Sequence, residues 1–446
     1  MSELALLGGP KAVTCDTDLN SPMKKWPIFT EEEENAILDV LHKNSMSDTG
    51  LAKEFEAEFA KWMGTEYALG FNNGTASLLA SFYGVGIRKG DEVICPSVVY
   101  WAACTSLLSL GAVPVFADLS RDTLCIDPDD IERKISDKTK AIIVVHYLSH
   151  PCDMDRIMAI AKKHNLKVIE DVSHAQGGKY KGQMLGTFGD VAAMSLMAGK
   201  SFAIGEAGMM VTNSKEIYEH ARALGHYERF TENTTTCEDL LPYVRMPLGG
   251  YKFRMHQMSA AVGLVQIKYY DERCKEIRKA MNYFWDLLEG VPGIRAHRTN
   301  EAEGSTMAGW YAAHGIYVPE ELGGLSITRF CEAVRAEGVF ECTPGANLPL
   351  HSHGLFKTAD VYGDGKPTRL AYATRDVREL DKDLEFSNVV GKYVYNIPWL
   401  KKYIPEEIEQ YANAFKKVAL NYKELLADDP GDPEHIGAWH FHKANK

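Results

Sequence analysis

The chain has 446 residues, 45% of them hydrophobic and 25% charged, which is the composition of a globular protein large enough for two domains. Its net charge of −12, without a block of lysine and arginine, argues against nucleic acid as a partner. The apolar runs fall short of the roughly 20 residues that cross a bilayer, and residues 1–10 lack the pattern of a secretory leader. We therefore expect a cytoplasmic protein with no membrane partner.

The nine cysteines stand singly along the chain, with no CxxC pair. This spacing fits neither a zinc site nor a disulfide framework. We expect reduced thiols that lie mostly in the core, and no metal.

A helix is predicted first, in FTEEEENAILDVLHKN (residues 29–44), with Thr30 as its N-cap and acids in its first turn. Short apolar runs then alternate with helical patterns, which is typical of a parallel sheet covered on both faces. Ligands of such sheets bind beyond the carboxyl ends of the strands. The predicted strands are EYALGF (66–71), DEVICP (91–96), VPVFAD (113–118), KAIIVVHY (140–147), KVIEDV (167–172) and IGEAGMMVTN (204–213).

One long helix is predicted from residue 254 to Gly290, and it forms a natural bridge to a second domain. We expect an N-terminal arm over residues 1–28, a large domain over residues 29–289 and a smaller domain over residues 290–446. The tail after about Ala427 is rich in proline, glycine and histidine, so we expect it to be loosely ordered.

The segment NNGTASLL (72–79) lies between a predicted strand and a predicted helix. Small residues at a helix N-terminus let backbone N–H groups approach an anion, so Gly74, Thr75 and Ala76 are candidates for a phosphate cradle. The segment alone also fits an ordinary glycine turn followed by a threonine cap.

Asp171 and His174 follow the apolar run of VIEDVSHAQGG (168–178). A carboxylate at the carboxyl edge of a sheet can face a ligand pocket, and the histidine three residues later can act with it as a polar pair. Taken alone, Asp171 could equally be a helix N-cap.

Lys200 is the single cation in MSLMAGKSFAIGEAGMMVTN (194–213). Such a lysine lies on an exposed loop, pairs with an anion or is kept for its reactivity. A phosphate cradle, an acid at a strand end and this lysine, with Ser195 as a phosphate-contacting hydroxyl, match what pyridoxal 5'-phosphate (PLP) requires. Tyr100 could supply an aromatic face for its ring, or could be an ordinary core aromatic.

These segments, together with GDEVICPSVVYWA and GYKFRMHQMSAAVGLVQI, resemble the DegT/DnrJ/EryC1/StrS family of PLP-dependent sugar aminotransferases. The resemblance implies an α/β fold of fold-type I: a large domain with a mostly parallel seven-stranded sheet between helices, and a smaller C-terminal α+β domain. It also implies that Lys200 is the catalytic Schiff-base lysine, with Asp171 at the pyridine nitrogen and His174 beside them. The implied phosphate contacts are Gly74 to Ala76 and Ser195, and Tyr100 falls where the family places its ring-stacking aromatic.

Several positions depart from the usual family pattern. Lys252 in GYKFRM replaces an asparagine that serves the neighbouring subunit's phosphate, so we expect a homodimer with shared active sites. His174 stands where many members have glutamine. This change, with SLMAGKS and the start LALLGGP, looks most like the subgroup that acts on inososes and related aminoglycoside precursors.

The implied reaction is a ping-pong transamination from glutamate or glutamine to a keto sugar or to a keto cyclitol such as scyllo-inosose. His351, Arg229 and Tyr227 are the candidates for substrate binding, although His351 and His353 could also be surface residues or a metal pair. A nucleotide-linked 4-keto or 3-keto sugar is the alternative acceptor. The alternative from a non-enzymatic class of function is a regulatory homologue that binds PLP without catalysis.

Overall fold

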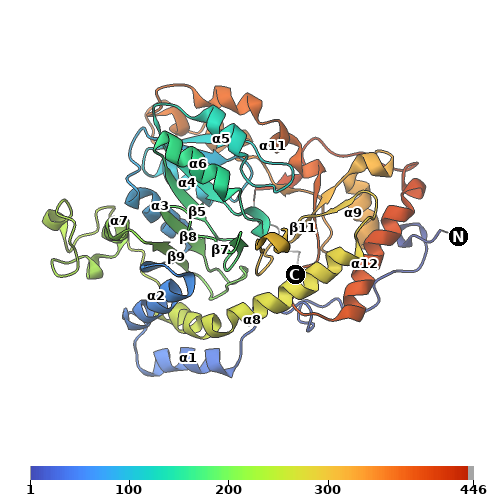
Figure 1. The fold of residues 1–446 in the computed structure, drawn as a ribbon, viewed down its shortest axis with the longest axis horizontal. Helices are drawn as coiled ribbons and strands as arrows, with labels where there is room; N and C mark the ends of the chain where they lie inside the picture. Colours follow the sequence, from blue (N-terminus) through green and yellow to red (C-terminus); the bar gives the residue numbers. More distant parts are fainter. Residues whose placement is uncertain (1, 440–446) are drawn as a thin grey trace.

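A seven-stranded sheet forms the centre of the computed structural model, which describes residues 2–439 (Figure 1). The strands lie in the order β1-β9-β8-β5-β4-β2-β3, and β9 is antiparallel to both of its neighbours, whereas the pairs from β8 to β3 are parallel. The bounds are β1 (Tyr67–Phe71), β2 (Glu92–Pro96), β3 (Val113–Ala117), β4 (Thr139–Val145), β5 (Lys167–Asp171), β8 (Val191–Ser195) and β9 (Gly208–Thr212).

Six of these strands are those that the sequence predicts, and the expected mostly parallel α/β sheet is confirmed. The alternation pattern misses β8, VAAMS. Its alanines have weak strand propensity, and tertiary packing makes the strand by placing it between β5 and β9.

Helices cover both faces of the sheet (Figure 1). The side chains of β8 alternate between the two faces. Val191 and Ala193 belong to one hydrophobic core, whereas Ala192 and Met194 belong to another on the opposite face. The helices are α1 (Glu31–His42), α2 (Gly50–Met63), α3 (Gly74–Gly84), α4 (Ala102–Leu108), α5 (Pro128–Lys134), α6 (Met154–His164), α7 (Lys215–Gly225), α8 (Gln257–Leu287), α9 (Ile327–Ala336), α10 (Gly354–Lys357), α11 (Glu385–Val389) and α12 (Pro405–Leu420).

The start of α1 follows from its sequence. The Thr30 hydroxyl accepts a hydrogen bond from the Glu32 N–H, and the Glu33 carboxylate accepts one from the Thr30 N–H at 2.7 Å. This capping box confirms Thr30 as the N-cap.

The helix α8 joins two packing units. Its first half packs beneath the large sheet, and residues from Ile277 onward enter a third core with α9 and α12. That core also contains Leu4 and Val13 of the N-terminal arm. The remaining strands are β6 (Lys179–Tyr180), β7 (Gln183–Met184), β10 (Ile294–Ala296), β11 (His314–Tyr317), β12 (Ala346–Asn347), β13 (Val394–Asn396) and β14 (Gly437–Ala438).

The described part of the tail is packed, which corrects the expectation of a loosely ordered end. Residues 437–438 form β14, which pairs with β12 in a parallel arrangement. The Trp439 ring then meets the ring of His353 edge-on at 4.5 Å. The expectation for residues 440–446 lies outside the described residues. Within residues 2–439, no helix has the length and apolarity to cross a membrane.

Candidate active site

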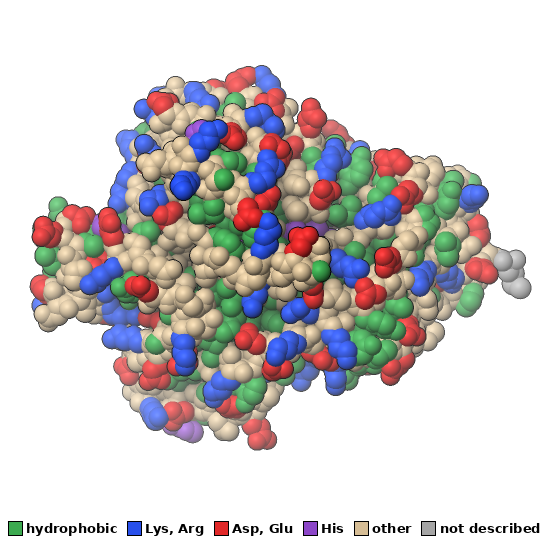
Figure 2. Space-filling view, viewed as in Figure 1, with side chains coloured by type: hydrophobic (Ala, Val, Ile, Leu, Met, Phe, Trp, Pro, Cys, Tyr) green, Lys and Arg blue, Asp and Glu red, His purple; other side chains and the backbone are tan. Residues whose placement is uncertain are grey.

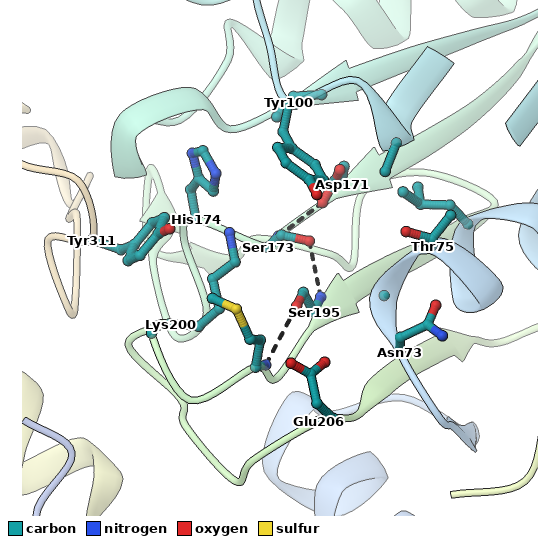
Figure 3. Close-up of a pocket in the computed structure, with 16 residues that line it drawn as sticks. Asn73, Thr75, Tyr100, Asp171, Ser173, His174, Ser195, Lys200, Glu206 and Tyr311 are labelled. Atoms are coloured by element: carbon teal, nitrogen blue, oxygen red, sulfur yellow. Dashed lines mark hydrogen bonds between the residues drawn. The ribbon is translucent and has the colours of Figure 1, made fainter. Parts of the chain in front are cut away.

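A cavity of about 490 Å³ lies where the carboxyl ends of β1, β5 and β8 meet. This is the edge at which a sheet of this kind binds ligands. It is lined by Asn73, Gly74, Thr75, Leu78, Tyr100, Ala102, Val145, Asp171, Ser173, His174, Ser195, Met197, Gly199, Lys200, Glu206 and Tyr311 (Figure 3).

Lys200 is held in the loop between β8 and β9, and its side chain reaches into the cavity (Figure 3). The residue is only 8% exposed, so an exposed surface loop is the wrong explanation for it. Its N–H donates to the Met197 carbonyl at 2.8 Å, and its carbonyl accepts from the Trp26 indole N–H at 2.9 Å. The backbone of the lysine is therefore fixed from two sides.

Gln176 connects the end of β8 to the residue that follows Lys200. Its amide nitrogen donates to the Ser195 carbonyl at 2.7 Å, and its amide oxygen accepts from the Ser201 hydroxyl at 2.8 Å. Gln176 is fully buried, so these bonds are shielded from water.

Burial lowers the pKa of the Lys200 amine to about 8, and the nearby Asp171 carboxylate opposes this shift. A lysine whose pKa lies near neutrality exchanges its proton readily and is a good nucleophile.

The low pKa of Lys200 predicts how stability depends on pH in the cofactor-free protein. Above pH 8 the unfolded chain keeps a proton on this amine that the folded chain has lost, so stability rises with pH. Between pH 8 and pH 9.5 we expect the free energy of unfolding of the wild type to gain about 1.5 kcal/mol over that of Lys200→Met. Urea denaturation at both pH values measures this difference, and a difference that stays constant would contradict it.

Asp171 is the last residue of β5, so it is a strand-end carboxylate and not a helix N-cap. Its Oδ1 accepts a hydrogen bond from the Ser173 N–H at 2.9 Å. Burial raises the pKa of Asp171, whereas the Ser173 hydrogen bonds and the charge of Lys200 lower it. A cation at this position would favour the ionised carboxylate.

His174 lies on a buried turn after β5, between two aromatic rings. Its ring stacks on Tyr147 at 5.6 Å and meets Tyr311 at 4.8 Å. Its Nδ1 accepts from the Leu148 N–H at 3.3 Å, which leaves the ring proton on Nε2. Burial, with a contribution from Lys200, lowers the pKa of His174 well below its usual value, so the ring is neutral near pH 7.

The turn before α3 brings its small residues against β8 and β9. A Cβ on Gly74 would lie 2.7 Å from the Ser195 Cβ, and a Cβ on Gly208 would lie 2.3 Å from the Asn73 carbonyl oxygen. Gly74 and Thr75 line the cavity, whereas Ala76 lines an adjoining hollow and donates its N–H to the Asn73 side chain at 2.8 Å.

Gly208→Ala should displace this turn, because the new methyl group meets backbone that cannot rotate away. We expect a loss of about 1–3 kcal/mol in the free energy of unfolding and weaker binding of PLP, measured by denaturation and by absorbance titration. Gly50→Ala is the matched control, since nothing lies within 4 Å of its Cβ position. Unchanged stability and unchanged PLP binding in Gly208→Ala would contradict the prediction.

Tyr100 follows β2 and lines the cavity with 37% of its surface exposed, so it is not an ordinary core aromatic. Burial and the negative charge of Glu206 raise the pKa of its hydroxyl. The phenol is therefore neutral at physiological pH.

The three residues expected at the substrate lie outside this cavity. His351 is buried, with Nδ1 2.6 Å from the Ser97 hydroxyl and Nε2 3.0 Å from the Asn388 side-chain oxygen, so both of its ring nitrogens are occupied. The guanidinium of Arg229 makes a two-pronged ion pair with Glu56 at 2.6 and 2.9 Å. Tyr227 is 37% exposed.

Lys252 is exposed and also lies outside this cavity. No cluster of three histidine, cysteine or acidic side chains in the described chain could hold a metal. The lining residues that the sequence does not predict include Ser173, Glu206 and Tyr311. The Ser173 hydroxyl accepts a hydrogen bond from the Ser195 N–H at 2.9 Å. Glu206 belongs to the segment that carries Lys200, whereas Tyr311 comes from a distant part of the chain with no local pattern to mark it.

Comparison with known proteins identifies the family of the chain. Residues 27–396 match the DegT/DnrJ/EryC1/StrS aminotransferase family. GDP-perosamine synthase from Escherichia coli is 37% identical over 279 residues, which cover 62% of this chain and 73% of that protein. L-glutamine:2-deoxy-scyllo-inosose aminotransferase from Streptoalloteichus tenebrarius is 31% identical over 351 residues, or 75% of this chain and 81% of that protein.

The solved structure of an aminotransferase from Psychrobacter cryohalolentis aligns with a TM-score of 0.75 at 28% identity. The alignment covers 90% of this chain and all of that one. The family match spans most of the chain and includes every residue that lines the cavity. The chain therefore belongs to the DegT/DnrJ/EryC1/StrS family of sugar aminotransferases, which are PLP-dependent enzymes.

Proposed function

We propose that this enzyme transfers an amino group from glutamate or glutamine to an uncharged keto cyclitol of the scyllo-inosose type, or to a similar free keto sugar. The observation that carries the proposal is one cavity that joins a buried lysine, a strand-end aspartate and a small-residue turn. The two half-reactions alternate in a ping-pong sequence.

The cavity has the side chains that PLP requires. Gly74, Thr75 and Ser195 offer backbone N–H and hydroxyl groups to a phosphate, and Gly74 is too close to Ser195 for any larger residue. Tyr100 offers an aromatic face, and Asp171 offers a carboxylate to the ring nitrogen. When bound, PLP supplies an electron sink for the carbon that gains or loses the amino group.

Two side chains carry the proton chemistry in this proposal. Lys200 binds the cofactor through its amine and, once released, moves a proton to or from the reacting carbon. Asp171 keeps a proton on the pyridine nitrogen, because an ionised carboxylate beside that atom stabilises its cationic form. His174 lines the cavity as a neutral ring.

The charges of the cavity favour an uncharged acceptor. Its charged lining residues are Asp171, Lys200 and Glu206, and Lys200 is the single cation among the described residues that line it. Lys200 is assigned to the cofactor, so the described lining of this chain leaves no cation for a phosphate-bearing acceptor, whereas a cyclitol needs only hydrogen bonds to its hydroxyls. A nucleotide-linked 4-keto or 3-keto sugar is the second candidate, because GDP-perosamine synthase is among the relatives.

A homodimer belongs to the same proposal. The segment after α7 projects from the left edge of the molecule in Figure 1 and carries Leu241, Tyr243, Met246 and Leu248, which are 38–75% exposed. Exposed apolar side chains in such a cluster mark a surface that binds another protein. Elsewhere, acidic and basic side chains intermix over the face that Figure 2 shows.

Replacing both Tyr243 and Met246 with glutamate should convert a dimer of 49.7 kDa subunits into monomers, because two desolvated charges would face the partner. Sedimentation measures the mass. Val361→Glu is the matched control, because Val361 is 65% exposed on a different loop. A double variant that stays dimeric would contradict this use of the surface.

The transaminase reaction is tested by the visible absorbance of the PLP-loaded protein. Glutamate or glutamine should convert the spectrum to that of the amine form of the cofactor, while alanine serves as the control donor. A panel of free inososes, free keto sugars and nucleotide-linked keto sugars then shows which acceptor restores the first spectrum. A spectrum that neither donor changes would favour the regulatory homologue, and recovery with nucleotide-linked sugars alone would exclude the cyclitol.

A further inference from the structure

The segment from Met307 to Ala313 has an unusual backbone. Ala308, Trp310 and Ala312 have φ values of +45°, +50° and +54°, so every second residue is left-handed although none of the three is glycine. Each such residue costs on the order of 1 kcal/mol or more, and so it persists only where its surroundings impose it.

Contacts from separate parts of the chain impose this shape. The Trp399 indole N–H donates to the Gly309 carbonyl at 2.8 Å, and the Ser149 hydroxyl donates to the Tyr311 carbonyl at 3.0 Å. A Cβ on Gly309 would lie 2.4 Å from the Cβ of Ser201, so only glycine allows this approach. The segment is thus fixed directly against the residue that follows Lys200.

The strained segment presents the Tyr311 ring to the cavity. The Lys200 Nζ lies 4.2 Å from the centre of that ring, within the range of a cation–π interaction. Figure 3 shows the two side chains next to each other. The Tyr311 ring in turn meets the ring of His174 at 4.8 Å. Because Lys200 is buried, few water molecules compete with the ring for its charge.

We propose that Tyr311 is a positioning residue for Lys200, whose protonated amine rests on the face of the Tyr311 ring. The role rests on the proposed function, in which this amine must carry a proton after it leaves the cofactor. The ring stabilises the ammonium form without forming a bond that must later break, and the strained backbone keeps the ring in place.

One other group near the amine also favours its charged form. The Asp171 carboxylate opposes the lowering of the Lys200 pKa, but it accepts the Ser173 N–H and is the carboxylate proposed for the cofactor nitrogen. His174 is neutral and cannot hold a cation through its Nε2–H. Tyr100 and Glu206 are the other titratable side chains among the described residues that line the cavity.

The test is the pH profile of Lys200 acylation by acetic anhydride in the full-length, cofactor-free protein, read by mass spectrometry. Tyr311→Leu removes the ring face, so the ammonium loses stabilisation and the midpoint of labelling should move to lower pH. At pH 7 the labelling rate, relative to its high-pH plateau, should rise about fivefold. Tyr311→Phe keeps the face and should retain the wild-type midpoint.

The profile separates this role from a merely structural one, because altered access to the lysine changes the plateau rate but leaves the midpoint in place. A wild-type midpoint in Tyr311→Leu, or an equal shift in Tyr311→Phe, would overturn the proposal. The PLP spectrum of the wild type tests the proposed function separately. If that spectrum responds to the amino donor while the midpoint stays fixed, the role of Tyr311 fails alone.

Discussion

Replacing Lys200 with alanine is expected to lower the transamination rate at least about a thousandfold, because general acid–base catalysis and covalent binding of the cofactor are lost together. The alanine fits the space and removes a buried amine, so the fold should remain intact. Steady-state turnover with glutamate or glutamine and the accepted ketone measures the loss.

A small soluble amine provides the control for this variant. Methylamine can enter the vacated space and carry the proton, so it should restore part of the activity of Lys200→Ala and none of the activity of Asp171→Asn. If Lys200→Ala retained a tenth of the wild-type rate, the lysine would not be the proton carrier.

Asp171→Asn is expected to lower turnover about a hundredfold or more, because a neutral amide no longer stabilises the protonated pyridine nitrogen. The amide oxygen can still accept the Ser173 N–H, so the variant keeps the local structure and changes mainly the charge. Turnover and the affinity for PLP are measured together.

Asp271→Asn is the matched control for this change, since Asp271 lies in α8 outside the cavity and accepts the Trp62 indole N–H at 3.0 Å. We expect wild-type turnover there. Equal losses in both aspartate variants, or none in Asp171→Asn, would remove the reason to place the cofactor nitrogen at Asp171.

The part of the fold that the sequence predicts is the part controlled by local patterns. Apolar runs that alternate with amphipathic ones predict the parallel strands, and Thr30 with Glu33 predicts the start of α1. The antiparallel direction of β9 is set by its two neighbours, and no local signal in its residues encodes it.

The residues of the site likewise fall into those that local patterns predict and those that tertiary packing brings in. The sequence predicts a strand that ends at Asp171 and a small-residue loop around Lys200, so their common cavity follows from the topology of the sheet. Tyr311 reaches the cavity through strained backbone and contacts with distant residues. His351 was expected at the substrate, but it is held by Ser97 and Asn388, which lie far from it in sequence. Pairings of this kind depend on tertiary packing, which composition and spacing do not reveal.

The hydrogen bond from the Trp26 indole to the Lys200 carbonyl has a consequence for the synthesis of the chain. The strands of the large sheet are all present once residue 212 has been made. The loop that carries Lys200, in contrast, also depends on contacts with the N-terminal arm and with the segment from Met307 to Ala313. That segment is itself fixed by the hydrogen bond from the Trp399 indole to the Gly309 carbonyl. Because domains fold as they emerge, the nascent protein has its sheet before it has a finished catalytic centre.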